Sequence, residues 1–141
     1  MAKWQNYIRL LMEDDLCQDA AIFCACDCEL LAAHPRGLLE NLTYCEMCNV
    51  VDCNRSCLHA VGLMLGGQRC MVIRDHLYQP GFNCMDLRTM PEKTGKETQS
   101  VAIIRINHVC LILIGKKGVA GGTLNFKAFK MACHIQENEC K

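Results

Sequence analysis

Two apolar runs separated by two residues constrain the fold of this chain more than any other feature. The runs cover residues 101–106 and 109–114, with Asn107 and His108 between them. Two such runs joined by a two-residue turn are typical of an antiparallel β-hairpin. The second run is the longest apolar stretch in the chain, and it is far too short to cross a bilayer. We therefore expect an antiparallel sheet in a protein with no transmembrane segment.

Helical and strand-like patterns alternate along the rest of the chain. An amphipathic helix is predicted over residues 2–13, and strands are predicted over 20–24 and 30–33. A capping box at Thr43–Glu46 should open a second helix, and the apolar spacing from Leu124 to Ile135 predicts a C-terminal one. Residues 90–98 are polar and predict an exposed loop. This order predicts an α+β fold in a single domain, residues 1–141, with helices on both faces of the sheet.

A second strand pair is predicted near the middle of the chain. Residues 69–74 alternate in character, which predicts a strand whose Cys70, Val72 and Arg74 share one face. The pattern resumes at residues 84–88, after a glycine break.

Three arginines belong to this strand pair. An antiparallel arrangement would bring Arg69, Arg74 and Arg88 together as a small cationic surface. The alternative is that they simply cover a solvated face of the sheet.

Formal charge is zero overall but is divided between the two halves of the chain. Residues 1–70 carry five basic and nine acidic side chains, whereas residues 71–141 carry ten and six. A dipolar chain of this kind is not a general nucleic-acid binder. An anionic partner should meet the C-terminal half.

Thirteen cysteines are many for a chain whose N-terminus lacks the apolar core of a signal peptide. The odd count and the apolar content argue against a secreted disulfide framework and favour reduced thiols in the cytoplasm. We do not expect a zinc site, because the sequence contains only one CxxC motif, Cys45–Cys48, and this motif falls in a predicted helix. Cys45 lies in the first turn of that helix, where a thiol pKa can be lowered, and is therefore the candidate for a reactive thiol.

No motif of catalysis is present. The glycine-rich stretch 115–122 lacks the GxxxxGK[ST] pattern of a phosphate loop. Paired carboxylates, a nucleophile elbow and a Ser/His/Asp arrangement are likewise not apparent in the sequence. We predict a protein that is not an enzyme and that uses no metal or cofactor.

Five segments, in this order and spacing, resemble the profilin family of small actin-monomer-binding proteins. The segments are residues 1–12 (with Trp4, Tyr7, Ile8, Leu11 and Met12), 17–22, 65–75, 85–89 and 115–122. The resemblance covers essentially the whole chain and is strongest to the vertebrate form. It implies a central antiparallel sheet with the N- and C-terminal helices on one face and shorter helices on the other. It also implies binding of monomeric actin, proline-rich proteins and phosphoinositides in the cytoplasm, in association with the cytoskeleton.

The resemblance implies an actin-binding surface at ten positions. They are Leu58, Arg69, Val72, Ile73, Arg74, Arg88, Val119, Gly122, Asn125 and Phe129. Other positions of that surface depart from the family, among them Phe82 and Phe126, which replace charged residues. If exposed, these two rings would form an altered apolar contact surface.

The resemblance also implies a polyproline platform and a phosphoinositide site. The platform positions are Trp4, Tyr7, Leu31, His134 and Ile135; the phosphoinositide candidates are Arg69, Arg74, Arg88 and Lys127. Leu31 and Cys140 stand where the family carries aromatic rings, which predicts weaker polyproline binding. Gln136 replaces an arginine, which predicts a weak anionic-lipid site.

Two alternative functions remain open at this point. One is a divergent profilin-like scaffold that binds proline-rich partners with weak or no actin binding. The other is a cysteine-rich metal or redox protein.

Overall fold

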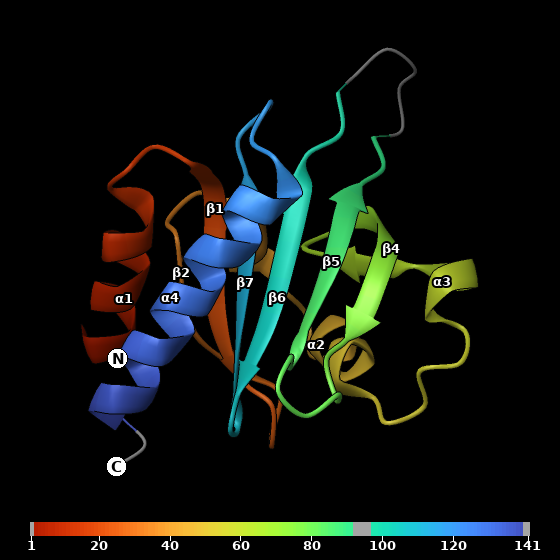
Figure 1. The fold of residues 1–141 in the computed structure, drawn as a ribbon, viewed down its shortest axis with the longest axis horizontal. Helices are drawn as coiled ribbons and strands as arrows, with labels where there is room; N and C mark the ends of the chain where they lie inside the picture. Colours follow the sequence, from red (N-terminus) through yellow and green to blue (C-terminus); the bar gives the residue numbers. More distant parts are fainter. Residues whose placement is uncertain (1, 92–96, 140–141) are drawn as a thin grey trace.

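The computed structural model describes residues 2–91 and 97–139. Seven antiparallel strands form one sheet in the order β2-β1-β7-β6-β5-β4-β3, and α1 and α4 lie across one face of it (Figure 1). The strands are β1 (Cys17–Cys24), β2 (Glu29–Ala33), β3 (Leu63–Leu65), β4 (Gln68–His76), β5 (Cys84–Thr89), β6 (Ser100–Ile106) and β7 (Val109–Gly115). The helices are α1 (Ala2–Met12), the 3-10 helix η1 (Leu38–Asn41), α2 (Tyr44–Val51), α3 (Leu58–Val61) and α4 (Gly121–Glu139).

The predicted hairpin forms the centre of the sheet. β6 and β7 pair from Val101 with Ile114 to Ile106 with Val109, and Asn107 takes the left-handed backbone conformation that the tight turn needs. Every residue of β7 is buried. A strand buried on both faces requires helices above and below the sheet, so the predicted α+β sandwich is confirmed.

Alternate side chains of β7 pack into two separate hydrophobic cores, one on each face of the sheet. Leu111 and Leu113 pack in the core under α1 and α4, together with Ile8 and Leu124. Ile112 and its neighbours on the other face pack against α2 and η1. The terminal helices therefore share one face, and the short helices cover the other.

The prediction that Cys70, Val72 and Arg74 share one face of β4 is wrong. Val72 pairs with Leu87 and Arg74 pairs with Asp86, so β4 contains one more residue than its partner at this point. Such a β-bulge reverses the alternation of the side chains beyond it. Cys70 and Val72 stay in the core, whereas Arg74 turns to the face that carries α4.

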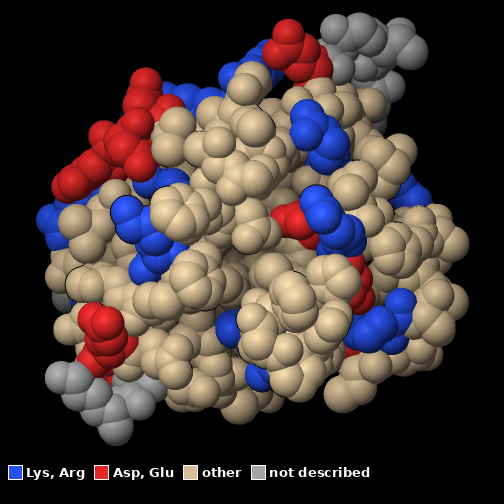
Figure 2. Space-filling view, viewed as in Figure 1, with Lys and Arg blue, Asp and Glu red and all other residues tan. Residues whose placement is uncertain are grey.

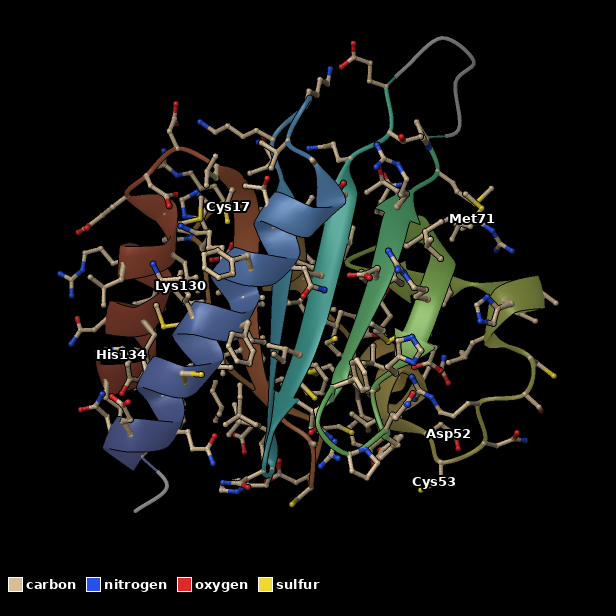
Figure 3. The ribbon with its side chains drawn as sticks, in the orientation of Figure 1. Cys17, Asp52, Cys53, Met71, Lys130 and His134 are labelled. Carbon is tan, nitrogen blue, oxygen red and sulfur yellow. The ribbon has the colours of Figure 1, made fainter. Side chains whose placement is uncertain are left out.

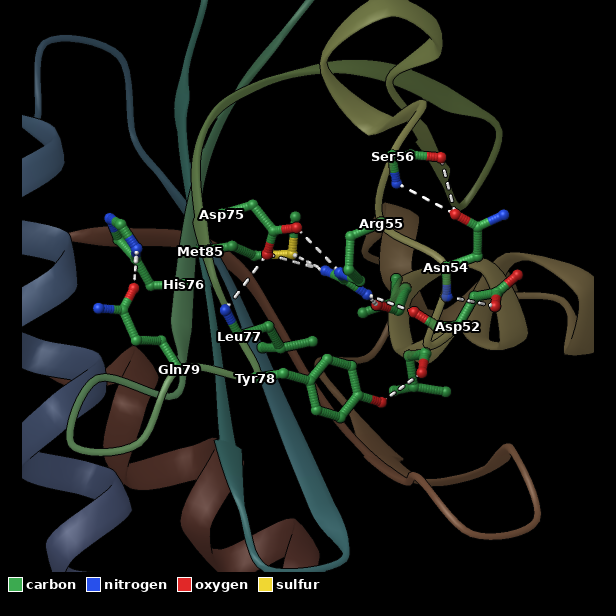
Figure 4. A network of polar contacts seen from close by, with 12 residues as sticks. Asp52, Asn54, Arg55, Ser56, Asp75, His76, Leu77, Tyr78, Gln79 and Met85 are labelled. Atoms are coloured by element: carbon green, nitrogen blue, oxygen red, sulfur yellow. Dashed lines mark hydrogen bonds and ion pairs between the residues drawn. The ribbon is translucent and has the colours of Figure 1, made fainter.

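A network of polar contacts fixes the long segment between α2 and α3 to the sheet (Figure 4). The Arg55 guanidinium donates to both carboxylate oxygens of Asp75, each at 2.9 Å, and also to the backbone oxygens of Val50 and Asp52. It lies 5.3 Å from the ring of Tyr78, on which it stacks. Arg55 thus connects the end of α2, the following loop and β4.

Of the loop predicted at residues 90–98, residues 92–96 lie outside the described residues. Met90, Pro91, Glu97 and Thr98 belong to no helix or strand.

Candidate functional site

A groove of about 590 Å³ lies between α4 and strands β4 and β5. Its walls come from segments that are far apart in the sequence. Six of the ten positions expected for actin binding line it, namely Ile73, Arg74, Arg88, Gly122, Asn125 and Phe129. Gly121 and Gly122, at the start of α4, line the groove without a side chain, and a Cβ at Gly122 would meet no atom within 4 Å.

Asp86 on β5 organises the polar floor of this groove. Its carboxylate accepts a hydrogen bond of 2.6 Å from the Asn125 side chain and lies 3.6 Å from the Arg74 guanidinium. Arg88, two residues further along β5, donates to the hydroxyls of Thr98 and Ser100 at 2.9 and 3.0 Å. The floor therefore contains the Arg74–Asp86 ion pair and the Arg88 guanidinium, which neutral hydroxyl groups hold in position.

Three phenylalanines surround this polar floor and point outward. Phe82, Phe126 and Phe129 are 55%, 63% and 53% exposed. His76 stacks against Phe82 with their ring centroids 5.4 Å apart. Exposed aromatic rings around a polar centre are typical of protein-binding surfaces. In Figure 2 this face is largely uncharged, and its basic side chains do not form one continuous patch.

Four expected positions lie outside the groove. Leu58 and Arg69 line a separate hollow of about 310 Å³ beside α3, where Arg69 donates to the Val61 carbonyl. Val72 is buried on the opposite face of the sheet, and Val119 packs in the core under α4.

A cluster of rings joins α1 to α4 on the same face of the molecule. The Trp4 and Tyr7 centroids are 5.8 Å apart, and the Tyr7 and His134 centroids are 5.6 Å apart with an edge-on geometry. Trp4 and Tyr7 are only 6% and 7% exposed, while His134 is exposed. Figure 3 shows His134 near the C-terminal end of α4, on the side facing α1.

The other expected platform positions surround this cluster. Leu31 on β2 is half-buried against the core that contains Trp4, and Ile135 is fully buried. Glu139 accepts hydrogen bonds from the Tyr7 hydroxyl at 2.7 Å and from Lys3 at 2.9 Å. These two hydrogen bonds hold the pKa of Glu139 below its ordinary value. Cys140 lies outside the described residues.

Lys127 is separated from the three arginines proposed to share its role. Its side chain is mostly buried beside α1 and pairs with Asp14. Arg74 and Arg88 lie in the groove on the other side of α4, and Arg69 lies beside α3.

The described cysteines are free thiols. Burial raises the pKa of Cys17 to about 11 and those of Cys70 and Cys110 to about 12, which makes these thiols unreactive. Within residues 2–91 and 97–139, no group of three or more His, Cys, Asp or Glu side chains is arranged to hold a metal ion. None of the described helices is long and apolar enough to span a membrane.

Several residues of the groove were missed by the sequence reasoning, and Asp86 and His76 are two of them. Asp86 lies at its centre and His76 at its aromatic end. The position of Asp86 could have been predicted, because it lies between the apolar residues Met85 and Leu87. In a strand its side chain must therefore point away from the core into which those two pack. The sequence does not predict the position of His76, because its contact with Phe82 depends on the conformation of the loop that follows β4.

Comparison with known proteins gives a consistent result. The profilin family model matches residues 2–140. Human Profilin-2 is 40% identical over 139 residues, covering 98% of this chain and 99% of the relative. Human Profilin-1 is 41% identical over 140 residues, covering 99% of both chains.

Solved structures agree with this result. Mouse Profilin IIa, in complex with a double repeat from the FH1 domain of mDia1, superposes with a TM-score of 0.90 at 40% identity. The match covers 96% of this chain and 97% of the mouse chain.

Proposed function

The chain belongs to the profilin family of non-enzymatic, actin-binding regulators of polymerisation, and on this premise we propose that it binds monomeric actin through the groove between α4, β4 and β5. The observation that carries the proposal is the convergence of six expected contact positions on one groove centred on Asp86. The groove combines fixed polar groups with exposed rings, and aromatic side chains are enriched at protein-binding interfaces.

The aromatic side chains give this surface its particular character. Phe82 and Phe126 replace charged residues, so the partner meets more apolar area and fewer charges here. Loss of charge at an interface slows association more than it weakens the equilibrium affinity. We therefore propose an actin complex that forms slowly and depends mainly on the rings and on Asn125.

Asn125 provides the test of this proposal. Asn125→Ala removes the hydrogen bond to Asp86 and is expected to weaken binding of monomeric actin by roughly tenfold, or about 1.4 kcal/mol. Binding is measured by sedimentation with labelled monomeric actin. Glu137→Ala is the matched control, because Glu137 is an exposed residue of the same helix outside the groove.

A flat titration for the unmodified chain would contradict the actin proposal and leave the scaffold alternative. Equal losses in the Asn125 and Glu137 variants would show that actin does not use this groove.

The cluster of Trp4, Tyr7 and His134 supports a second proposal, binding of proline-rich segments. A polyproline helix presents rigid rings and accepting carbonyls, which suit a surface of aromatic edges and polar tips. The mouse relative named above is in complex with an FH1 repeat. We place the ligand between α1 and α4, against the exposed His134 and the half-buried Leu31, with the nearly buried rings of Trp4 and Tyr7 beneath it.

Leu31→Trp is expected to strengthen binding of a proline oligomer by roughly fivefold to tenfold. A tryptophan at this half-buried position would add a ring next to Trp4, and an aromatic contact is worth about 1 kcal/mol. Quenching of tryptophan fluorescence measures the affinity. Leu31→Met adds no ring and serves as the control; an equal gain in both variants would contradict the proposed position of the ligand.

Phosphoinositide binding is proposed as a weak activity of the arginines alone. Arg74 and Arg88 open into the same groove, so a headgroup there would compete with actin. Lys127 is already neutralised by Asp14 and lies on the other side of α4. A protein that binds these partners acts in the cytoplasm, in association with the cytoskeleton.

A further inference from the structure

Two cysteines from separate elements meet on the face opposite α1 and α4. Cys28 ends the turn between β1 and β2, and Cys48 lies in α2. The Cys48 thiol donates to the Cys28 sulfur across 3.3 Å. A disulfide bond is about 2.05 Å long, so the two sulfurs need to approach by roughly 1.2 Å, which small side-chain rotations can supply.

Both thiols stand on backbone that is fixed in place. The capping box of α2 is complete, with Thr43 and Glu46 each accepting from the other's backbone N–H. Glu46 also accepts from the N–H groups of Gly66 and Gly67 at 2.9 and 3.0 Å, which holds the start of α2 against the turn between β3 and β4. A thiol pair held in contact in this way reacts as an intramolecular pair.

The turn that carries Cys28 is held in the same way. The Ala25 N–H donates to the His108 carbonyl at 2.7 Å, which ties this turn to the turn of the central hairpin. Cys28 is buried in the core under α2, and Cys48 packs against that core from its partly exposed position. Solvent therefore reaches Cys48 first.

We propose that Cys28 and Cys48 are an oxidation site, which a peroxide converts into an intramolecular disulfide. The Cys48 thiolate attacks one oxygen of hydrogen peroxide, the O–O bond breaks, and Cys48 becomes a sulfenic acid while hydroxide leaves. The Cys28 sulfur then attacks the Cys48 sulfur, the S–O bond breaks, and the disulfide forms as a second hydroxide leaves. The two thiol protons convert both hydroxides to water, so two thiols and one peroxide give one disulfide and two waters.

The direction of attack follows from burial. Burial and the adjacent Cys48 sulfur raise the pKa of Cys28, so its thiolate is scarce. Cys28 suits the second step, where its position in contact with Cys48 compensates for a low thiolate fraction. Peroxide meets the partly exposed Cys48 before the buried Cys28, and rapid formation of the disulfide limits further oxidation of Cys48.

The disulfide would have a measurable effect on the protein. It closes a loop from residue 28 to residue 48 and attaches α2 to the β1–β2 turn. Closing a loop of this length restricts the unfolded chain, and the thermal midpoint is expected to rise by about 5 to 10 °C.

Peptide mapping of the unmodified chain tests the proposal directly. The reduced protein is treated with one equivalent of hydrogen peroxide, alkylated and digested without reductant. Cleavage after Asp and Glu separates Cys28 from Cys26 at Asp27, and it separates Cys48 from Cys45 at Glu46. A linked peptide containing Cys28 and Cys48 is the expected product. Recovery of both as alkylated thiols, or linkage mainly to other cysteines, would overturn the proposal.

Variants give an independent readout. Cys28→Ser and Cys48→Ser are expected to lose the rise in thermal midpoint on oxidation. Cys26→Ser and Cys45→Ser are the matched controls, because these thiols are exposed residues of the same turn and the same helix; both should keep it. Persistence of the rise in Cys48→Ser would refute the assignment, whatever the folding yield of Cys28→Ser.

Discussion

Replacing Arg55 by alanine is expected to lower the free energy of unfolding by about 3 kcal/mol at neutral pH. The Arg55 and Asp75 side chains are only 18% and 9% exposed, and their two hydrogen bonds are both 2.9 Å long. Removing one partner of a mostly buried ion pair leaves the other charge without compensation. The loss is measured by urea unfolding followed by circular dichroism.

Arg74→Ala is the control for this prediction. Arg74 also faces an aspartate, but its side chain is 71% exposed and the ion pair is 3.6 Å long. Exposed pairs of this kind contribute less than about 1 kcal/mol. Equal losses in the two variants would contradict the argument from burial.

The contribution of Asp75 should also depend on pH. Burial opposes ionisation of Asp75, but the hydrogen bonds from Arg55 and from the Leu77 backbone outweigh it and hold the pKa below its ordinary value. An acid whose pKa is lower in the folded state adds stability above its unfolded pKa, about 3.9, and loses it as the pH falls through the folded pKa. The difference between the unmodified chain and Arg55→Ala should therefore narrow below about pH 4. A difference that is constant down to pH 2 would contradict this account.

The sequence predicted those elements whose position follows from a single local pattern of residues. Apart from Arg105, the two strands of the hairpin at residues 101–114 are apolar on both faces, and a central position in a covered sheet satisfies that pattern. The capping box at Thr43 likewise set the start of α2. The short elements η1, α3 and β3 were not predicted, because three or four residues show no period.

The bulge at Ile73 could not be predicted from the sequence. At a bulge, two residues of one strand lie opposite a single residue of its partner, and this depends on how β4 pairs with β5 rather than on the sequence of either strand. It has a direct consequence for the candidate site. Without it, Arg74 would point into the core beside Val72; with it, Arg74 reaches Asp86 in the groove. The alternation in the sequence had placed Arg74 on the other face of β4, and its role in binding stays a prediction.

The candidate site was predicted through family motifs, and the structure separates what those motifs had grouped. Arg69 and Arg88 both precede buried residues in alternating strands, yet one lies beside α3 and the other in the groove. Lys127 lies on α4 at a position that faces α1 rather than the strands. Which side of a helix meets which neighbour depends on how the helix packs on the sheet.

Trp4→Ala is expected to lower the free energy of unfolding by about 3 to 4 kcal/mol and to abolish binding of a proline oligomer. Trp4 is buried in the core shared by α1 and α4 and contacts Tyr7, so truncation leaves a large cavity there. Trp4 is the only tryptophan in the sequence, so the binding of this variant must be followed by calorimetry.

His134→Ala distinguishes recognition from packing at the same site. His134 is exposed and meets the Tyr7 ring in an edge-on geometry, so its loss should change the unfolding free energy by less than about 0.5 kcal/mol. Binding of the proline oligomer should still fall by roughly fivefold, because the ligand loses one of its rings. Trp4→Phe keeps most of the packing and secures a folded protein for the comparison. If Trp4→Phe and His134→Ala both bind as the unmodified chain does, these rings only hold α1 to α4, and proline-rich partners bind elsewhere.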